Sequence, residues 1–136
     1  MAIPSLPLQN PCDTVTFKCS TACSLATKQY NYVYQSAVDE VTVAAAAQNA
    51  AGMNVFILQN TPAIGEEADC AVLGSGDSFL VAATGAISIG ANLSCSTGGA
   101  GKLSTDGSMF YSKAKDVSTA SGDIIVVATL TGQQST

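Results

Sequence analysis

The chain has 136 residues, with 47% hydrophobic residues, 11% charged residues and a formal net charge of −5. This length predicts one domain with a modest core. Positive charge comes from five lysines, and there is no arginine or histidine. The acidic balance argues against nucleic acid as a partner, because no basic stripe is available to neutralise phosphates. It also argues against an anionic membrane surface.

The charged fraction is low, since an average domain has about 25%. Two explanations stay open: other subunits cover much of the surface, or Ser, Thr, Asn and Gln solvate it. No apolar run approaches the roughly 20 residues that a membrane span needs. The start of the sequence lacks the basic region of a secretory signal, so we expect a chain made in the cytoplasm.

The sequence contains no recognisable catalytic arrangement. Without histidine, the usual general base and the commonest metal ligand are missing. Glu66, Glu67 and Asp69 form the one acidic cluster. These carboxylates would need partners from other loops to bind a metal, whereas a solvated turn needs none. We therefore expect a protein that is not an enzyme, with no catalytic, cofactor or metal site.

Five cysteines stand at positions 12, 19, 23, 70 and 95. An odd number fits a reducing compartment. The Cys19–Cys23 spacing could begin a metal site with Cys12, but no second pair or histidine completes it. Small buried thiols in a β-core are the favoured interpretation. A disulfide between Cys12 and Cys19 or Cys23 is the alternative in oxidising surroundings.

Residues 1–13 are predicted to form an extended N-terminal arm, because its prolines prevent both a helix and a central strand. One interpretation is a disordered terminus. The other is a segment that lies on a partner protein. Its candidate interface residues are Ile3, Pro4, Leu6, Pro7, Leu8 and Pro11.

Residues 15–19 alternate with period two and predict a first strand. A second strand is predicted at 30–35, with Tyr30, Tyr32 and Tyr34 on one face. This tyrosine ladder either packs over the edge of the core with wet hydroxyl groups or serves as a glycan-binding platform. A third strand at 41–43 leads into an Ala tract, Ala44 to Ala51, which suits a short helix or, preferably, a strand and a turn.

Short apolar runs at 55–58, 71–73, 78–81, 93–95 and 124–130 predict further strands. The last is continuous enough to suggest burial on both faces. Residues 74–77 have the composition of a tight hairpin, and 113–120 is a helical or extended connector. These features predict an all-β fold: a small β-barrel domain over 14–131 with at most one short helix, followed by a polar tail over 132–136.

The C-terminal half carries a resemblance to a known family. It lies in Ala50–Gly52, Val55–Leu58, Pro62–Glu66, Gly85–Ala91, Ala100–Leu103 and Ala120–Val127. Over residues 40–130 this pattern resembles the capsid decoration, or cement, proteins of tailed bacteriophages, in the β-tulip-like group of the phage-lambda head decoration protein. The stretch 85–93, Gly-Ala-Ile-Ser-Ile-Gly-Ala-Asn-Leu, is at its centre.

The resemblance implies a structural protein on the outer capsid surface of a virion. Such a protein would be a homotrimer that cements neighbouring subunits of the major capsid protein, using its N-terminal segment. The alternative function is a non-catalytic module that binds glycans or the host surface through Tyr30, Tyr32 and Tyr34.

Overall fold

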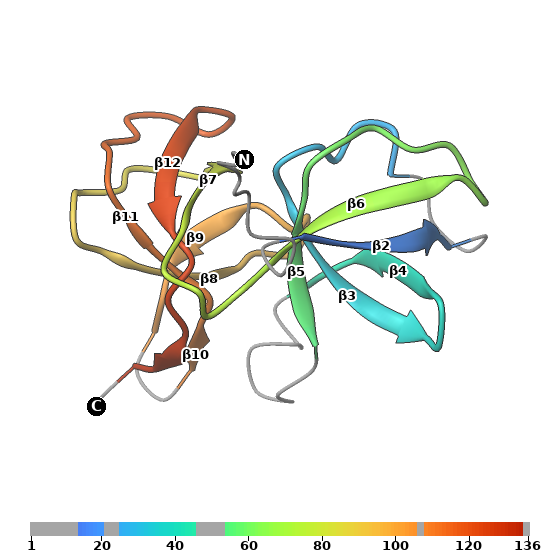
Figure 1. Ribbon diagram of the computed structural model, residues 1–136. Helices are drawn as coiled ribbons and strands as arrows, with labels where there is room; N and C mark the ends of the chain where they lie inside the picture. Colours follow the sequence, from blue (N-terminus) through green and yellow to red (C-terminus); the bar gives the residue numbers. More distant parts are fainter. Residues whose placement is uncertain (1–13, 21–24, 46–53, 106–107, 135–136) are drawn as a thin grey trace, which may run out of the picture.

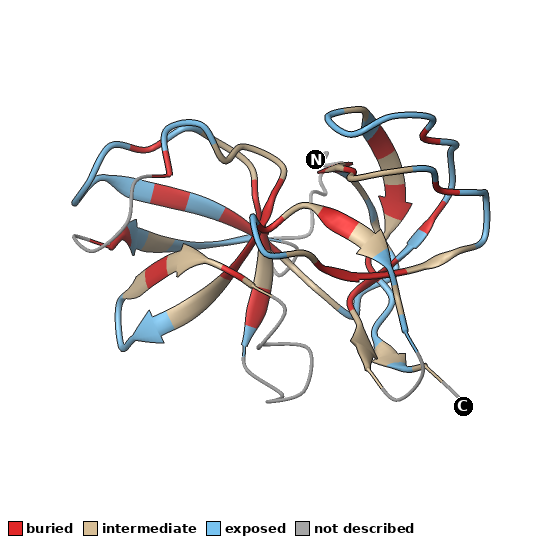
Figure 2. Cartoon of the chain, turned by 180° about the vertical axis from the view of Figure 1, so that it is seen from behind, coloured by how far each residue is buried: buried red, intermediate tan, exposed pale blue. Residues whose placement is uncertain are grey.

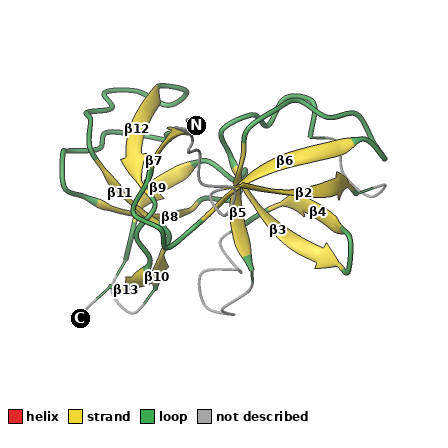
Figure 3. Ribbon diagram, in the orientation of Figure 1, coloured by secondary structure: helices red, strands yellow, loops and turns green. Residues whose placement is uncertain are grey.

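The computed structural model describes residues 14–20, 25–45, 54–105 and 108–134 (Figure 1). Every regular element in these ranges is a strand, as Figure 3 shows. The predicted all-β class with a small barrel is confirmed. The N-terminal arm lies outside the described residues, as does the Ala tract from residue 46 onward.

The first half of the chain forms a closed five-stranded barrel. Its strands are β2 (Thr14–Cys19), β3 (Tyr32–Ala37), β4 (Glu40–Val43), β5 (Val55–Leu58) and β6 (Glu67–Val72). They follow the order β2-β4-β3-β5-β6, and β6 closes on β2 with Thr14 opposite Ala71. The pairing of β2 with β4 is parallel and the other barrel pairings are antiparallel. Closure pairs both edges of every strand.

The second half forms an antiparallel sheet beside the barrel (Figure 1). Its order is β7 (Ser78–Ala82), β12 (Ile124–Ala128), β11 (Ser112–Ala114), β8 (Asn92–Cys95) and β9 (Gly101–Leu103). A single parallel bridge, Ala83 to Gly101, links the two ends of the sheet. A two-stranded ribbon of β10 (Met109–Phe110) and β13 (Gly132–Gln133) lies at its lower end in Figure 3. We call these two halves the barrel and the C-terminal sheet.

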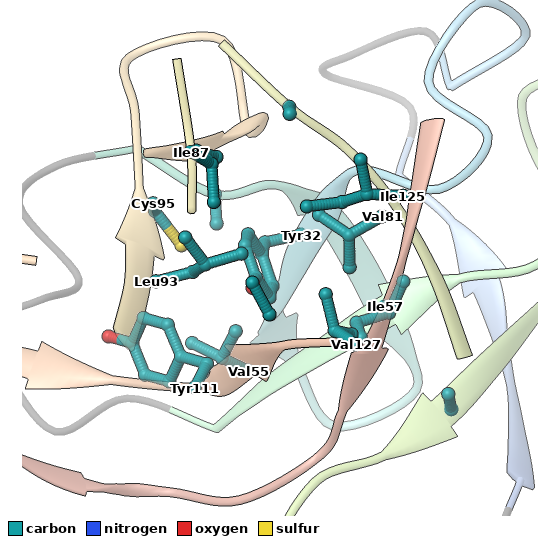
Figure 4. Packing of buried hydrophobic residues seen from close by; sticks show 14 residues of the cluster. Tyr32, Val55, Ile57, Val81, Ile87, Leu93, Cys95, Tyr111, Ile125 and Val127 are labelled. Carbon is teal, nitrogen blue, oxygen red and sulfur yellow. The ribbon is translucent and has the colours of Figure 1, made fainter. Parts of the chain in front are cut away.

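Strand alternation sends neighbouring side chains into two different cores. The interior of the barrel contains Cys19, Leu25, Val33, Val41, Leu58, Ala68 and Cys70. Tyr32 and Ile57 point the other way and pack with side chains of the C-terminal sheet, including Val81, Leu93 and Ile125 (Figure 4). Figure 2 shows the buried residues continuing from one half into the other. The two halves therefore share one core between them.

The segment 98–101 passes through this junction. Gly99 has a φ of +88°, and its carbonyl accepts a hydrogen bond of 2.7 Å from the Tyr32 amide. A Cβ atom at Gly99 would lie 2.7 Å from Val43 Cγ2 and 2.9 Å from the Tyr32 carbonyl oxygen. Only glycine combines this backbone conformation with so close an approach.

The predicted hairpin at 74–77 is wrong, because β6 belongs to the barrel and β7 to the C-terminal sheet. The segment is instead the connection between the halves. The buried Thr129 anchors it: its carbonyl accepts the Gly74 amide at 2.6 Å, and its hydroxyl lies 3.1 Å from both Ser75 Oγ and the Asp77 carbonyl. Turn residues specify that the chain bends but not which strand it joins next.

Two further expectations differ from the structure, those for β12 and for the tail. β12 alternates between buried and accessible residues, and Ile124 is 46% exposed, so burial on both faces is wrong. The connector 113–120 contains part of β11, which agrees with the extended form of the prediction and not with the helical one. The expected tail begins with Gly132 and Gln133, which pair with Phe110 and Met109. β11 and β13 are short and polar, so their sequences lack the apolar alternation that marks a strand.

Candidate interaction surface

An open, mostly apolar cleft lies where the barrel meets the C-terminal sheet and the ribbon. Its volume is about 310 Å³, at the lower end of the roughly 300–1,000 Å³ range of ligand pockets. β5 and β6 form one wall, and the other comes from β10 and the residues next to the ribbon. The lining residues are Asn54, Val55, Phe56, Val72, Leu73, Met109, Tyr111 and Thr131.

The cleft is built by the ends of strands. Phe56 and Val72 are register partners on β5 and β6, which places both at the same end of the barrel. Tyr111 stands between β10 and β11, where its amide donates to the Leu93 carbonyl at 2.8 Å. Figure 4 shows the Tyr111 ring beside Val55. The Tyr111 ring also packs at 5.6 Å, centroid to centroid, from the Tyr32 ring.

Among the described residues, none of the eight that line the cleft carries a charge at neutral pH. Burial raises the pKa of the Tyr111 phenol above its ordinary value, so the group stays protonated. Asn54, Thr131 and Tyr111 supply the polar atoms, and aliphatic, aromatic and thioether groups supply the rest. Such a lining suits an apolar segment better than a charged metabolite.

The three predicted tyrosines do not form one exposed ladder. Tyr30 precedes β3 with a φ of +68°, so strand alternation does not extend to it. Tyr32 is fully buried, and its hydroxyl is hydrogen-bonded to the Ser112 hydroxyl. Tyr34 is half-buried and packs against the shared core. Glycan binding by this strand remains a hypothesis, but the Tyr32 ring is not accessible for it.

The described cysteines are packing residues. Cys19, Cys70 and Cys95 are buried. Burial, reinforced by the nearby Asp69 carboxylate, raises the pKa of the Cys70 thiol to about 12. Burial likewise raises the pKa of the Cys95 thiol to about 12. Thiols of this kind stay protonated and are poor nucleophiles. Cys12 and Cys23 lie outside the described residues.

The acidic cluster is exposed. Glu66 belongs to a turn, whereas Glu67 and Asp69 lie on β6. Glu66 accepts the Ala63 amide through Oε1 at 3.0 Å, and its own amide donates to the Ala63 carbonyl at 2.9 Å. The side chain of Asn60 stabilises the same region, because its Oδ1 accepts a hydrogen bond of 3.0 Å from the Asp69 amide. In the described ranges, no group of three His, Cys, Asp or Glu side chains converges as metal ligands would. The described residues also include no helix that could span a membrane.

The structure brings together cleft residues that the sequence does not identify as a group. Met109, Tyr111 and Thr131 are more than 35 residues away from Val72 and Leu73, and no periodicity connects them. The predicted interface residues Ile3, Pro4, Leu6, Pro7, Leu8 and Pro11 lie outside the described residues. Their segment joins the described chain at Thr14, which pairs with a neighbour of the cleft residue Val72.

No protein-family model and no curated protein matches the sequence. Among solved structures, the chain is similar to the head fiber gp8.5 N base of bacteriophage phi29, with a TM-score of 0.62 and 16% sequence identity. The match covers 85% of this chain and 92% of the phi29 chain. At this identity the likeness shows that the two chains share a fold.

Proposed function

We propose that this chain is a non-catalytic structural protein of a phage virion that binds the outer surface of the capsid. The observation that carries the proposal is the fold likeness to the phi29 head fiber base, which extends over 92% of that chain. A match of this extent includes both halves of the present chain and not a single common sheet. The sequence pattern over 40–130 independently resembles another group of phage capsid proteins.

The finer part of the proposal is that the chain cements neighbouring subunits of the major capsid protein and acts as a homotrimer. Its N-terminal arm would lie on the capsid through Ile3, Leu6 and Leu8. Each buried apolar group contributes at about 25 cal/mol per Å². Symmetric repetition over a shell combines many such modest contacts into strong overall attachment.

The described surface offers a second candidate contact. Ile87 and Ser118 form a bridge between two loops, and the neighbouring Ile89 and Val117 are 68% and 51% exposed. Two exposed apolar side chains on paired loops are suited to burial against another subunit. Ile89 belongs to the stretch 85–93 that carries the family resemblance.

The first experiment is to purify particles of the phage that encodes the chain and search them by mass spectrometry and immunogold labelling. We expect a fixed number of copies per particle, with label on intact capsids. A chain that stays in the lysate and never sediments with particles would overturn the proposal.

Three measurements test its finer parts. A chain that lacks residues 2–12 is added to particles that lack the protein. We expect no occupancy of the capsid, while circular dichroism shows retained β-structure. Unchanged occupancy would refute the role of the arm.

Particles without the protein should rupture at a lower temperature than wild-type particles if the protein cements the shell. The two rupture temperatures should be equal if the protein only decorates the shell. Light scattering should give three times 13.7 kDa for a trimer.

A further inference from the structure

We propose that the cleft between the barrel and the ribbon binds the apolar side chains of the chain's own N-terminal arm. The inference concerns the free chain, before any capsid is bound. In the proposed virion role, Ile3, Leu6 and Leu8 would leave the cleft to contact the capsid. Failure of the inference would leave the proposed virion role untouched, and loss of that role would leave this contact testable.

The point at which the arm joins the barrel supports this occupant. Thr14 is the first residue of β2 and pairs with Ala71 on β6. The next residue on β6, Val72, lines the cleft, and so does Leu73. Since paired strands lie about 4.8 Å apart, the described chain begins beside the cleft wall.

The arm has the necessary reach. Leu8 is six residues before Thr14, and an extended chain spans up to about 3.3 Å per residue. Leu8 can therefore reach points within about 20 Å of Thr14, and Leu6 reaches further. A second copy of the chain would have to approach by diffusion, whereas a short tether holds the arm at an effective concentration in the millimolar range.

The two surfaces also match chemically. Residues 1–12 contain no charged side chain, and the described cleft lining contains none either. The cleft is open to solvent, so apolar side chains that enter it would displace water from an apolar lining. Met109 has an adaptable side chain that fills irregular contacts. Pro4, Pro7 and Pro11 restrict the unbound arm, which lowers the entropy lost on docking.

The test uses the full chain with ¹³C-methyl methionine, because Met109 lines the cleft and the chain has only three methionines. The Met109 signal is assigned with Met109→Leu. The arm variant is Leu6→Asp/Leu8→Asp, and the matched control is Ser5→Asp/Gln9→Asp, which adds the same charge at neighbouring polar positions. We expect the Met109 methyl resonance to move in the arm variant and to stay in place in the control.

A synthetic peptide of residues 1–12 should then return the Met109 resonance of the arm variant to its original position in a saturable manner. The same peptide with both aspartates should bind at least about tenfold more weakly, since two buried leucines are lost. An identical Met109 resonance in the wild type and the arm variant would overturn the proposal. Equal binding of the two peptides would do so as well.

A mixing experiment identifies whose arm occupies the cleft. Labelled arm variant is combined with an equal amount of unlabelled wild-type chain. An unchanged Met109 signal supports docking of the chain's own arm. Recovery of the wild-type resonance would show that the arm of a second copy fills the cleft, and would overturn the intramolecular contact. Amide spectra of each variant verify that the barrel and the C-terminal sheet are folded.

Discussion

Tyr32 connects the two halves of the molecule at the scale of one residue. Its backbone belongs to β3 of the barrel, its ring lies in the shared core, and its hydroxyl is hydrogen-bonded to Ser112 of β11. Burial raises the pKa of this phenol above its ordinary value, so it stays neutral. A buried polar pair of this kind specifies how the barrel and the sheet fit together.

Removing the Tyr32 hydroxyl with Tyr32→Phe should lower the free energy of unfolding by about 1–3 kcal/mol, because the buried Ser112 hydroxyl loses its partner. Tyr34→Phe on the same strand is the matched control and should change it by less than about 0.5 kcal/mol. Urea denaturation measures both. Equal effects for the two variants would contradict the proposed importance of the hydroxyl pair.

Gly99→Ala should destabilise the protein by about 2–5 kcal/mol. Left-handed backbone costs a non-glycine residue about 1–2 kcal/mol, and overpacking adds about 1–3 kcal/mol. Gly98→Ala is the neighbouring control, since its Cβ would lie 3.7 Å from the flexible end of Lys28 and its φ is not positive. Thermal denaturation should separate the two variants clearly, and similar melting temperatures would refute the close approach at Gly99.

Asp123 should make the free energy of unfolding depend on pH. The amides of Thr119 and Ala120 donate to its Oδ2 at 2.9 and 3.2 Å, and they hold the pKa of the carboxyl below its ordinary value. A lowered folded-state pKa stabilises the fold above the unfolded value of about 3.9, and this contribution disappears as pH falls through the folded pKa. Asp123→Asn should therefore be less stable than the wild type at pH 7.

The stability difference between wild type and Asp123→Asn should shrink as the pH drops below about 4, where the wild-type carboxyl becomes protonated too. Denaturation series at several pH values measure it. Asp39→Asn, on the exposed turn after β3, makes the same charge change without these amide donors and serves as the control. A difference between wild type and Asp123→Asn that stays constant from pH 7 to pH 2 would show that the carboxylate has no such role.

At the scale of elements, the connection between β6 and β7 determines how the barrel and the C-terminal sheet are joined. Thr129→Val keeps the side-chain volume but removes the hydroxyl contacts with Ser75 and Asp77. We expect a loss of about 1–2 kcal/mol and faster hydrogen exchange at the Gly74 amide. Thr42→Val, at a half-buried position on β4, is the control. Unchanged exchange at Gly74 would show that the hydroxyl does not anchor the connection.

The positions of some strands can be predicted from the sequence, and those of others cannot. β2, β5, β7 and β12 are rich in apolar and β-branched residues, and their positions agree with the predicted strands to within two residues. β9, β11 and β13 contain Gly, Lys, Ser or Gln, and β10 has only two residues. The sequence does not predict these four strands, because pairing with neighbours and not intrinsic preference makes them strands. The cleft could not be predicted, since its walls come from distant parts of the chain.

The whole molecule should unfold as one unit even though it contains two sheets. The shared core takes Tyr32 and Ile57 from the barrel and Val81, Leu93 and Ile125 from the C-terminal sheet, so neither half can lose its structure without exposing the other. Calorimetry should give one transition with equal calorimetric and van't Hoff enthalpies. Two resolved transitions would show that the halves are energetically independent.

The closure of the barrel between its first and last strands has a consequence for synthesis on the ribosome. β2 cannot pair with β6 until residues 67–72 have left the exit tunnel. In the same way, β7 cannot pair with β12 until residues 124–128 have left it. Pairings between strands so distant in the chain form slowly, because a long loop must close before any contact stabilises it. About half of the nascent chain thus emerges before the barrel can be completed, and nearly all of it before the C-terminal sheet can be. This interval is when its apolar strands are most exposed to aggregation.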